Sequence, residues 1–90
     1  MIEISPDHFK AFTQLGLLYL TKEKYDDSAE SLNKAIKINK DYYLPYTVMG
    51  NLMSNTSNSE KAIKYFLNAL KLNPEGHETL IGLANAYYDS

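Results

Sequence analysis

Apolar and polar residues alternate along this chain with the period of an α-helix, and the same arrangement returns every 34 residues. Leu15-Gly16 recurs as Met49-Gly50 and again as Leu83-Ala84, each time at that spacing. A large apolar residue stands three positions before each pair, and another lies four positions after its first member, which makes one stripe along a helix. A fixed period of this length indicates a stack of similar units, none of which buries its apolar face alone.

Each complete unit is predicted to form two antiparallel helices, because a second apolar stripe follows the first after a short polar connection. The second stripe consists of Ser28, Ala29, Leu32, Ala35 and Ile36 in unit one and of Ala62, Ile63, Phe66, Ala69 and Leu70 in unit two. The first connection, Thr21 to Lys24, is polar, and the second, Asn55 to Ser59, is a cluster of turn-forming residues. The fold class is therefore all-α, with about five helices.

Small residues recur where paired helices are expected to approach most closely. Gly16, Gly50 and Ala84 share one position of the repeat, and Ala35 and Ala69 share another. A glycine inside a helix costs about 0.5–1 kcal/mol relative to alanine. We therefore expect close packing against the second helix to offset that cost at Gly16 and Gly50.

These residues resemble the tetratricopeptide repeat family, whose pattern is an aromatic residue, Leu-Gly, Tyr, Ala, an aromatic residue, Ala and Pro at fixed spacings. Unit one matches with Phe12, Leu15-Gly16, Tyr19, Ser28, Leu32, Ala35 and Lys40. Unit two matches with Tyr46, Met49-Gly50, Met53, Ala62, Phe66, Ala69 and Pro74, and unit three with Leu80, Leu83-Ala84 and Tyr87. Ser28 and Lys40 depart most from the pattern. The resemblance implies a right-handed α-solenoid of antiparallel helix pairs, with the first helix of each pair on the concave side.

Both ends of the chain fall inside a unit. Residues 2–6 match residues 70–74, so we assign 1–8 to the end of a preceding repeat, 9–42 to repeat one, 43–76 to repeat two and 77–90 to the first helix of repeat three. Arrays of this kind usually need about three repeats and a polar capping helix. We expect a fragment of a longer array, or a chain whose open ends are covered by another copy of itself.

Composition limits the function classes. The net charge of −2 and the absence of arginine argue against a nucleic-acid binder. The absence of cysteine excludes disulfides and thiolate metal sites, and neither a leader peptide nor a membrane span is recognisable. We therefore expect a cytoplasmic protein with no cofactor, no metal and no membrane contact.

No catalytic set is recognisable in the sequence. His8 and His77 lie near matching helix starts in different units, and Asp26-Asp27 suits the positive end of a helix. We therefore expect no enzymatic activity from these residues.

The face of the first helices opposite the core stripe is the candidate partner-binding site, because it is mostly neutral and partly apolar. Its residues are Lys10, Thr13, Leu17, Leu20, Leu44, Thr47, Asn51, Asn55, Glu78, Ile81, Asn85 and Tyr88. Asn51 and Asn85 share one position, and an asparagine amide both donates to and accepts from a peptide backbone. The alternative is that these residues contact neighbouring helices or further repeats.

Three functions remain open at this stage. The first is a protein-interaction scaffold that binds a peptide or helix in its concave groove. The second is a self-assembly segment, and the third is the substrate-recruiting arm of a larger enzyme such as a glycosyltransferase. Some members of the family clamp the C-terminal carboxylate of heat-shock chaperones, but the corresponding residues do not match here, and Glu78 would repel a carboxylate.

Overall fold

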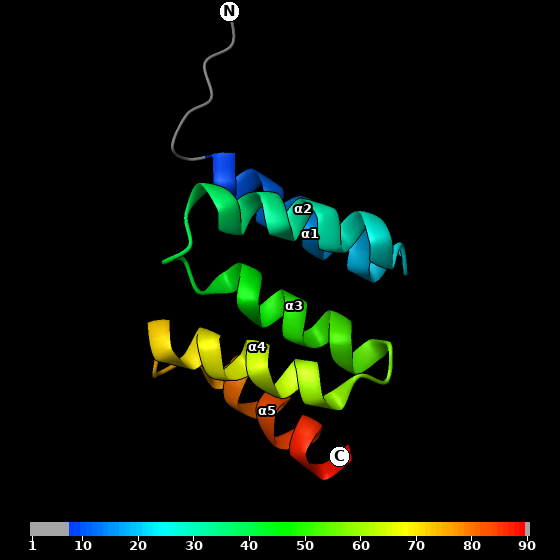
Figure 1. Ribbon diagram of the computed structural model, residues 1–90, viewed down its shortest axis with the longest axis vertical. Helices are drawn as coiled ribbons and strands as arrows, with labels where there is room; N and C mark the ends of the chain where they lie inside the picture. The colour runs from blue at the N-terminus through cyan, green and yellow to red at the C-terminus, as the bar shows by residue number, and fades with distance from the viewer. Residues whose placement is uncertain (1–7, 90) are drawn as a thin grey trace, which may run out of the picture.

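The computed structural model describes residues 8–89, and this part of the chain forms helices and loops only (Figure 1). The helices are α1 (His8–Thr21), α2 (Tyr25–Ile38), α3 (Leu44–Asn55), α4 (Ser59–Leu72) and α5 (His77–Asp89). The prediction of an all-α fold with five helices is confirmed for these residues. The predicted end of a preceding repeat lies outside them, apart from His8, which begins α1.

The helices stack one above another along the longest axis of the molecule (Figure 1). The pairs α1–α2, α3–α4 and α4–α5 share the most extensive contacts, and α3 also touches α1, α2 and α5. The backbones of successive first helices therefore approach one another closely, whereas the backbones of α2 and α4 do not.

Local sequence explains where the helices begin and end. Glu23 and Ser57 stand 34 residues apart and both have a positive φ, 61° and 62°, in the turns that lead from the first helix of a unit to the second. The Asn58 side chain accepts a hydrogen bond from the backbone N–H of Lys61 and caps α4. Pro45 lies in the first turn of α3, where its missing N–H leaves no helical bond unmade.

The core consists of two clusters, each formed between neighbouring units. The first comprises the buried residues Leu20, Leu32, Val48, Met49 and Leu52. The second comprises Ala62, Phe66 and Ala86. Both extend across unit boundaries, so each unit buries part of its apolar surface against the next.

Glycine permits the closest contacts in the core, as predicted for Gly16 and Gly50. A Cβ atom at Gly16 would lie 2.5 Å from Cγ of Leu32, and one at Gly50 would lie 2.6 Å from Cδ1 of Phe66. The sequence analysis missed a third such position, because a Cβ at Gly82 would lie 2.7 Å from Cζ of the same Phe66 ring. Phe66, which is fully buried, is thus held between α3 and α5 by two glycines.

Two buried hydrogen bonds connect helices through hydroxyl groups. Ser28, at a position where the family pattern has alanine, donates to the carbonyl oxygen of Gly16 over 2.7 Å. Thr47 and Thr79 join α3 to α5 through their hydroxyl oxygens, which lie 2.8 Å apart. Ser28 is therefore compatible with the fold, since its hydroxyl group has a hydrogen-bond partner.

Part of the predicted core stripe is exposed at the two ends of the stack. Leu15 is 39% exposed, whereas Met49, its equivalent in unit two, is 3% exposed. At the other end Leu80, Ala84 and Tyr87 are exposed as well. These faces are exposed because no helix between residues 8 and 89 packs against them.

Replacing Gly50 with alanine is expected to destabilise the domain by about 1–3 kcal/mol, because the added methyl group overlaps the Phe66 ring. Thermal unfolding followed by circular dichroism measures the effect. Asn51→Ala is the matched control, since Asn51 is the next residue of α3 and its side chain is exposed. An unchanged or higher melting temperature for Gly50→Ala would show that close approach is not required there.

The Thr47–Thr79 bond predicts a non-additive pair of substitutions. Each single Thr→Val variant leaves one buried hydroxyl without a partner and should lose about 1–3 kcal/mol of unfolding free energy. The double variant removes both hydroxyls and should be more stable than the sum of the two single effects predicts. Denaturant unfolding of the four proteins tests this, and strict additivity would contradict it.

Candidate functional site

Residues at equivalent repeat positions form rows across the first helices. Leu17, Asn51 and Asn85 are spaced by 34 residues, and all three are exposed on α1, α3 and α5. Because these helices are in contact, the row runs across the stack and not along one helix. A second row consists of Lys10, Leu44 and Glu78, of which Leu44 is half-buried against the first core cluster.

Eight of the predicted site residues are exposed, and we call them the inner face. They are Lys10, Leu17, Asn51, Asn55, Glu78, Ile81, Asn85 and Tyr88. Two of the apolar members are strongly exposed, Ile81 at 63% and Tyr88 at 90%. The inner face therefore combines neutral amides with apolar side chains.

Three other predicted site residues are buried and are corrected here. Thr13 donates its hydroxyl hydrogen to the carbonyl oxygen of Phe9 over 2.7 Å, within its own helix. Leu20 belongs to the first core cluster. The Thr47 hydroxyl group forms the hydrogen bond with Thr79. At most 8% of each of these residues is exposed, so their side chains offer little surface to a partner.

A cavity of about 380 Å³ lies between the start of α3 and the start of α5. Its lining residues are Tyr43, Leu44, Thr47, Asn73, Glu75, Gly76, His77, Glu78 and Thr79. Sequence reasoning placed Leu44, Thr47 and Glu78 in the site but missed Asn73 and Glu75, which the α4–α5 loop supplies. With two glutamates and no lysine, the cavity suits a basic group better than an acidic one.

His77 also lines this cavity, beside Glu75 and Glu78. A nucleophile and its base need to lie within hydrogen-bond distance of each other. The Thr47 and Thr79 hydroxyls are bonded to each other, and His77 has no hydrogen-bonded partner among residues 8–89. The arrangement is therefore that of a polar recess and not of an activated nucleophile.

Aromatic residues close the neighbouring loop between α2 and α3. The ring of Tyr42 packs edge-on against Phe9, with centroids 5.1 Å apart, and against Tyr43 at 5.8 Å. Burial raises the pKa of the Tyr42 hydroxyl, and the adjacent Tyr43 raises it further. Tyr42 therefore stays neutral at physiological pH, and its ring packs against the first turn of α1.

The described residues contain neither a metal-binding cluster nor a membrane-spanning helix. No group of three or more His, Cys, Asp or Glu side chains among residues 8–89 is placed to hold a metal ion. None of the five helices is both long and apolar enough to span a bilayer.

Comparison with known proteins gives relatives that include two receptors and one transferase. The peroxisomal targeting signal receptor of Saccharomyces cerevisiae is 33% identical over 60 residues, which is 67% of this chain and 10% of the receptor. The mitochondrial import receptor subunit TOM70 of Rattus norvegicus is 35% identical over 72 residues, 79% of this chain and 12% of that protein. The UDP-N-acetylglucosamine–peptide N-acetylglucosaminyltransferase of Giardia intestinalis is 30% identical over 64 residues, 71% of this chain and 4% of the enzyme. The chain thus spans about a tenth, or less, of the length of these relatives.

A solved structure and a family model agree with this result. The structure of a MamA mutant superposes with a TM-score of 0.77 at 30% identity, over 93% of this chain and 61% of that one. The model of the tetratricopeptide repeat matches residues 9–42 and 45–75, which is most of the chain. The helix pairs, the glycine contacts and these matches together show that the chain belongs to the tetratricopeptide repeat family.

Proposed function

We propose that this domain is a protein-interaction module that binds a peptide or helix of a partner along the inner face. The observation that carries the proposal is the row Leu17, Asn51 and Asn85, exposed at equivalent positions of three helices that contact one another. The fold does not explain the row, because none of these side chains packs in either core cluster. A partner-binding role gives a reason for the repeated asparagine.

The spacing of the two asparagines suits an extended peptide backbone. Packed helices lie roughly 8–10 Å apart, and about three residues of extended chain cover that distance. Asn51 and Asn85 would then hold two peptide groups of the same segment, each by its side-chain amide. Ile81 and Tyr88 would take apolar side chains, and the recess with Glu75 and Glu78 would take a lysine or arginine.

The comparisons support a binding role and no catalysis by this domain. By their names, two of the relatives are receptors, one for a peroxisomal targeting signal and one for mitochondrial import. We infer that the partner here is likewise a protein segment, read through its backbone and a few side chains. The third relative, a glycosyltransferase, supports the alternative that the domain recruits substrate for an enzyme encoded elsewhere in a longer chain.

Selection of a displayed peptide library against the domain, followed by fluorescence anisotropy of the best peptide, tests this proposal. The double variant Asn51→Ala/Asn85→Ala should weaken binding about tenfold, since two hydrogen bonds to the peptide are lost. Asn33→Ala on α2 is the matched control, because Asn33 is also an exposed helical asparagine. Equal affinities for the double variant and the control would show that the peptide does not bind through the two asparagines of the inner face.

Self-association is a second candidate, favoured by the apolar residues exposed on α5, among them Leu80, Ile81 and Tyr88. It predicts a molar mass above the 10.2 kDa of one chain, rising with concentration in sedimentation equilibrium. Ile81→Glu/Tyr88→Glu should then return the mass to that of the monomer, because two carboxylates would be buried in the contact. A constant mass of one chain for the unmodified protein would exclude this candidate.

A further inference from the structure

A second hollow surface lies along α4, where residues of α3 and of the α2–α3 loop also line it. Two cavities of about 360 and 290 Å³ adjoin there and share Asn68. The first is lined by Met53, Lys61, Lys64, Tyr65 and Asn68, and the second by Lys40, Tyr46, Asn68, Lys71 and Leu72. We call the two cavities together the outer groove. The backbones of α2 and α4 stand apart here, and α3 supplies Met53 and Tyr46 to its lining.

The outer groove is strongly biased toward positive charge. Lys40, Lys61, Lys64 and Lys71 line it, and no aspartate or glutamate does. All four lysine side chains are exposed, and none forms an ion pair with another residue of the described range. The chain as a whole has a net charge of −2. The outer groove is therefore a positively charged surface on a protein whose net charge is negative.

The repeat accounts for only one of these lysines, Lys71, whose equivalent in unit one is Lys37. The residues 34 positions before Lys61 and Lys64 are Asp27 and Glu30, so the equivalent surface of unit one carries the opposite charge. Lys40 stands where the family pattern and unit two have proline. A fold that tolerates either charge at the positions of Lys61 and Lys64 does not require lysine there.

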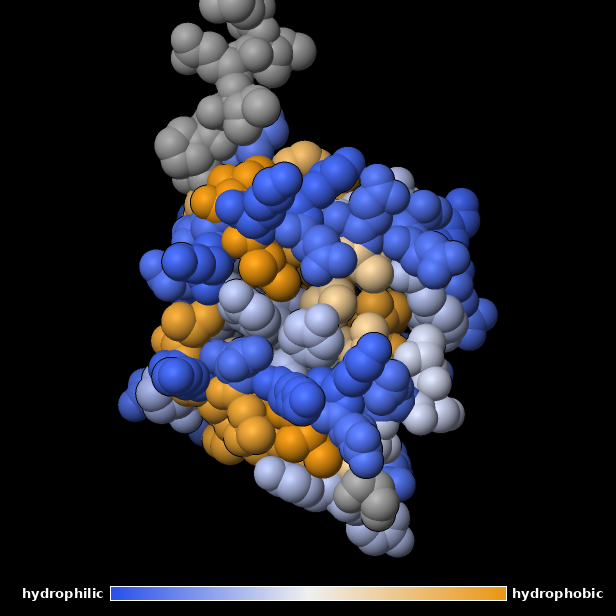
Figure 2. All heavy atoms as spheres, in the orientation of Figure 1, coloured by the Kyte–Doolittle hydropathy of each residue, from blue (hydrophilic) through white to orange (hydrophobic). Residues whose placement is uncertain are grey.

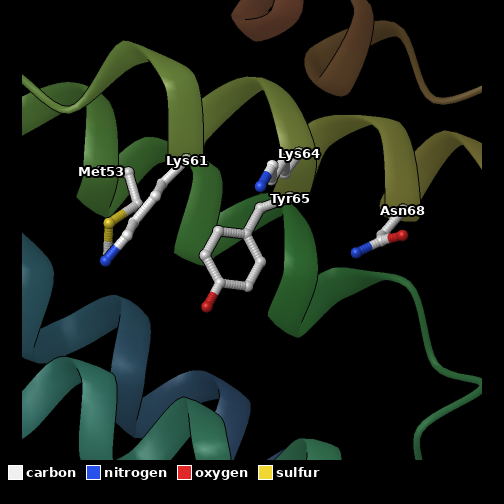
Figure 3. Close-up of a pocket in the computed structure, with 5 residues that line it drawn as sticks. All are labelled: Met53, Lys61, Lys64, Tyr65 and Asn68. Carbon is white, nitrogen blue, oxygen red and sulfur yellow. The ribbon is translucent and has the colours of Figure 1, made fainter.

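The floor of the outer groove is less polar than its rims. Figure 2 shows pale and orange side chains between hydrophilic rims over α2 and α4. In Figure 3 the half-buried Tyr65 ring and Met53 extend from α4 and α3 into the gap toward α1 and α2, beside Lys61. At the far end the Tyr46 hydroxyl donates to the carbonyl oxygen of Lys40 over 3.1 Å and fixes the loop that carries this lysine.

We propose that the outer groove binds an acidic segment of a partner protein in an extended conformation. Lys61 and Lys71 are ten residues apart on α4, a distance of roughly 15 Å along the helix, which corresponds to about five residues of extended chain. Carboxylates would lie against the lysines, and one aromatic or aliphatic residue would lie on Tyr65 and Met53. Because the outer groove is concave, it fits a single extended chain better than the broad surface of a membrane or of a nucleic-acid duplex.

The test uses the whole chain and a fluorescein-labelled peptide with three glutamates on each side of one phenylalanine. We expect saturable anisotropy that weakens as salt rises, and little binding of the peptide in which glutamine replaces every glutamate. Lys61→Gln/Lys64→Gln should lower the affinity about fivefold, the scale for two exposed ion pairs. Both lysines are exposed, so circular dichroism should show unchanged folding.

Matched variants separate the outer groove from net charge and from the inner face. Lys22→Gln/Lys24→Gln removes the same charge from the exposed α1–α2 loop and should change the affinity less than twofold, as should Asn51→Ala/Asn85→Ala. Equal binding of the glutamate and glutamine peptides, or an equal loss in both lysine double variants, overturns the proposal. Binding to phosphatidylserine vesicles without binding to the peptide also overturns it.

Discussion

The contact between one aromatic ring and two glycines holds the second half of this domain together. Phe66 of α4 is fully buried between Gly50 of α3 and Gly82 of α5, where a side chain on either glycine would overlap the ring. Dispersion contacts depend steeply on distance, so this close approach gives the small second cluster most of its cohesion. The position of α5 relative to α3 follows from it, and with that position the spacing of the inner-face residues.

Sequence periodicity was sufficient for the helices and their pairing, because every unit repeats the same apolar stripe and a small residue at the same position, Gly16, Gly50 or Ala84. It was insufficient for Gly82, which has no equivalent glycine in the other units, since Gln14 and Val48 occupy that position. It also placed Thr13 and Thr47 on the surface. A threonine hydroxyl that bonds to its own helix or to a second threonine is satisfied when buried, and helical spacing alone does not reveal such a partner.

The two candidate binding surfaces depend on different features of the sequence. The inner face repeats with the fold, so its asparagines were visible as soon as the period was known. Three of the four lysines of the outer groove, Lys40, Lys61 and Lys64, break the repeat, and the cavities that they line depend on how α3 and α4 pack. Lys40 departs from the family pattern, and its neighbours in space come from α3 and α4.

The missing contact between α2 and α4 also has a mechanical consequence. Successive units contact each other through their first helices and through the packing of α2 on α3 and of α4 on α5, so rotation of one unit against the next about the inner contacts shifts each second helix over the first helix that follows it. Such a rotation would widen or narrow the gap between α2 and α4 and at the same time change the separation of the inner-face rows. A ligand wedged between α2 and α4 would hold that angle fixed. Occupancy of one side of the stack would then alter the affinity of the other through curvature alone, with no chain of side-chain contacts between them.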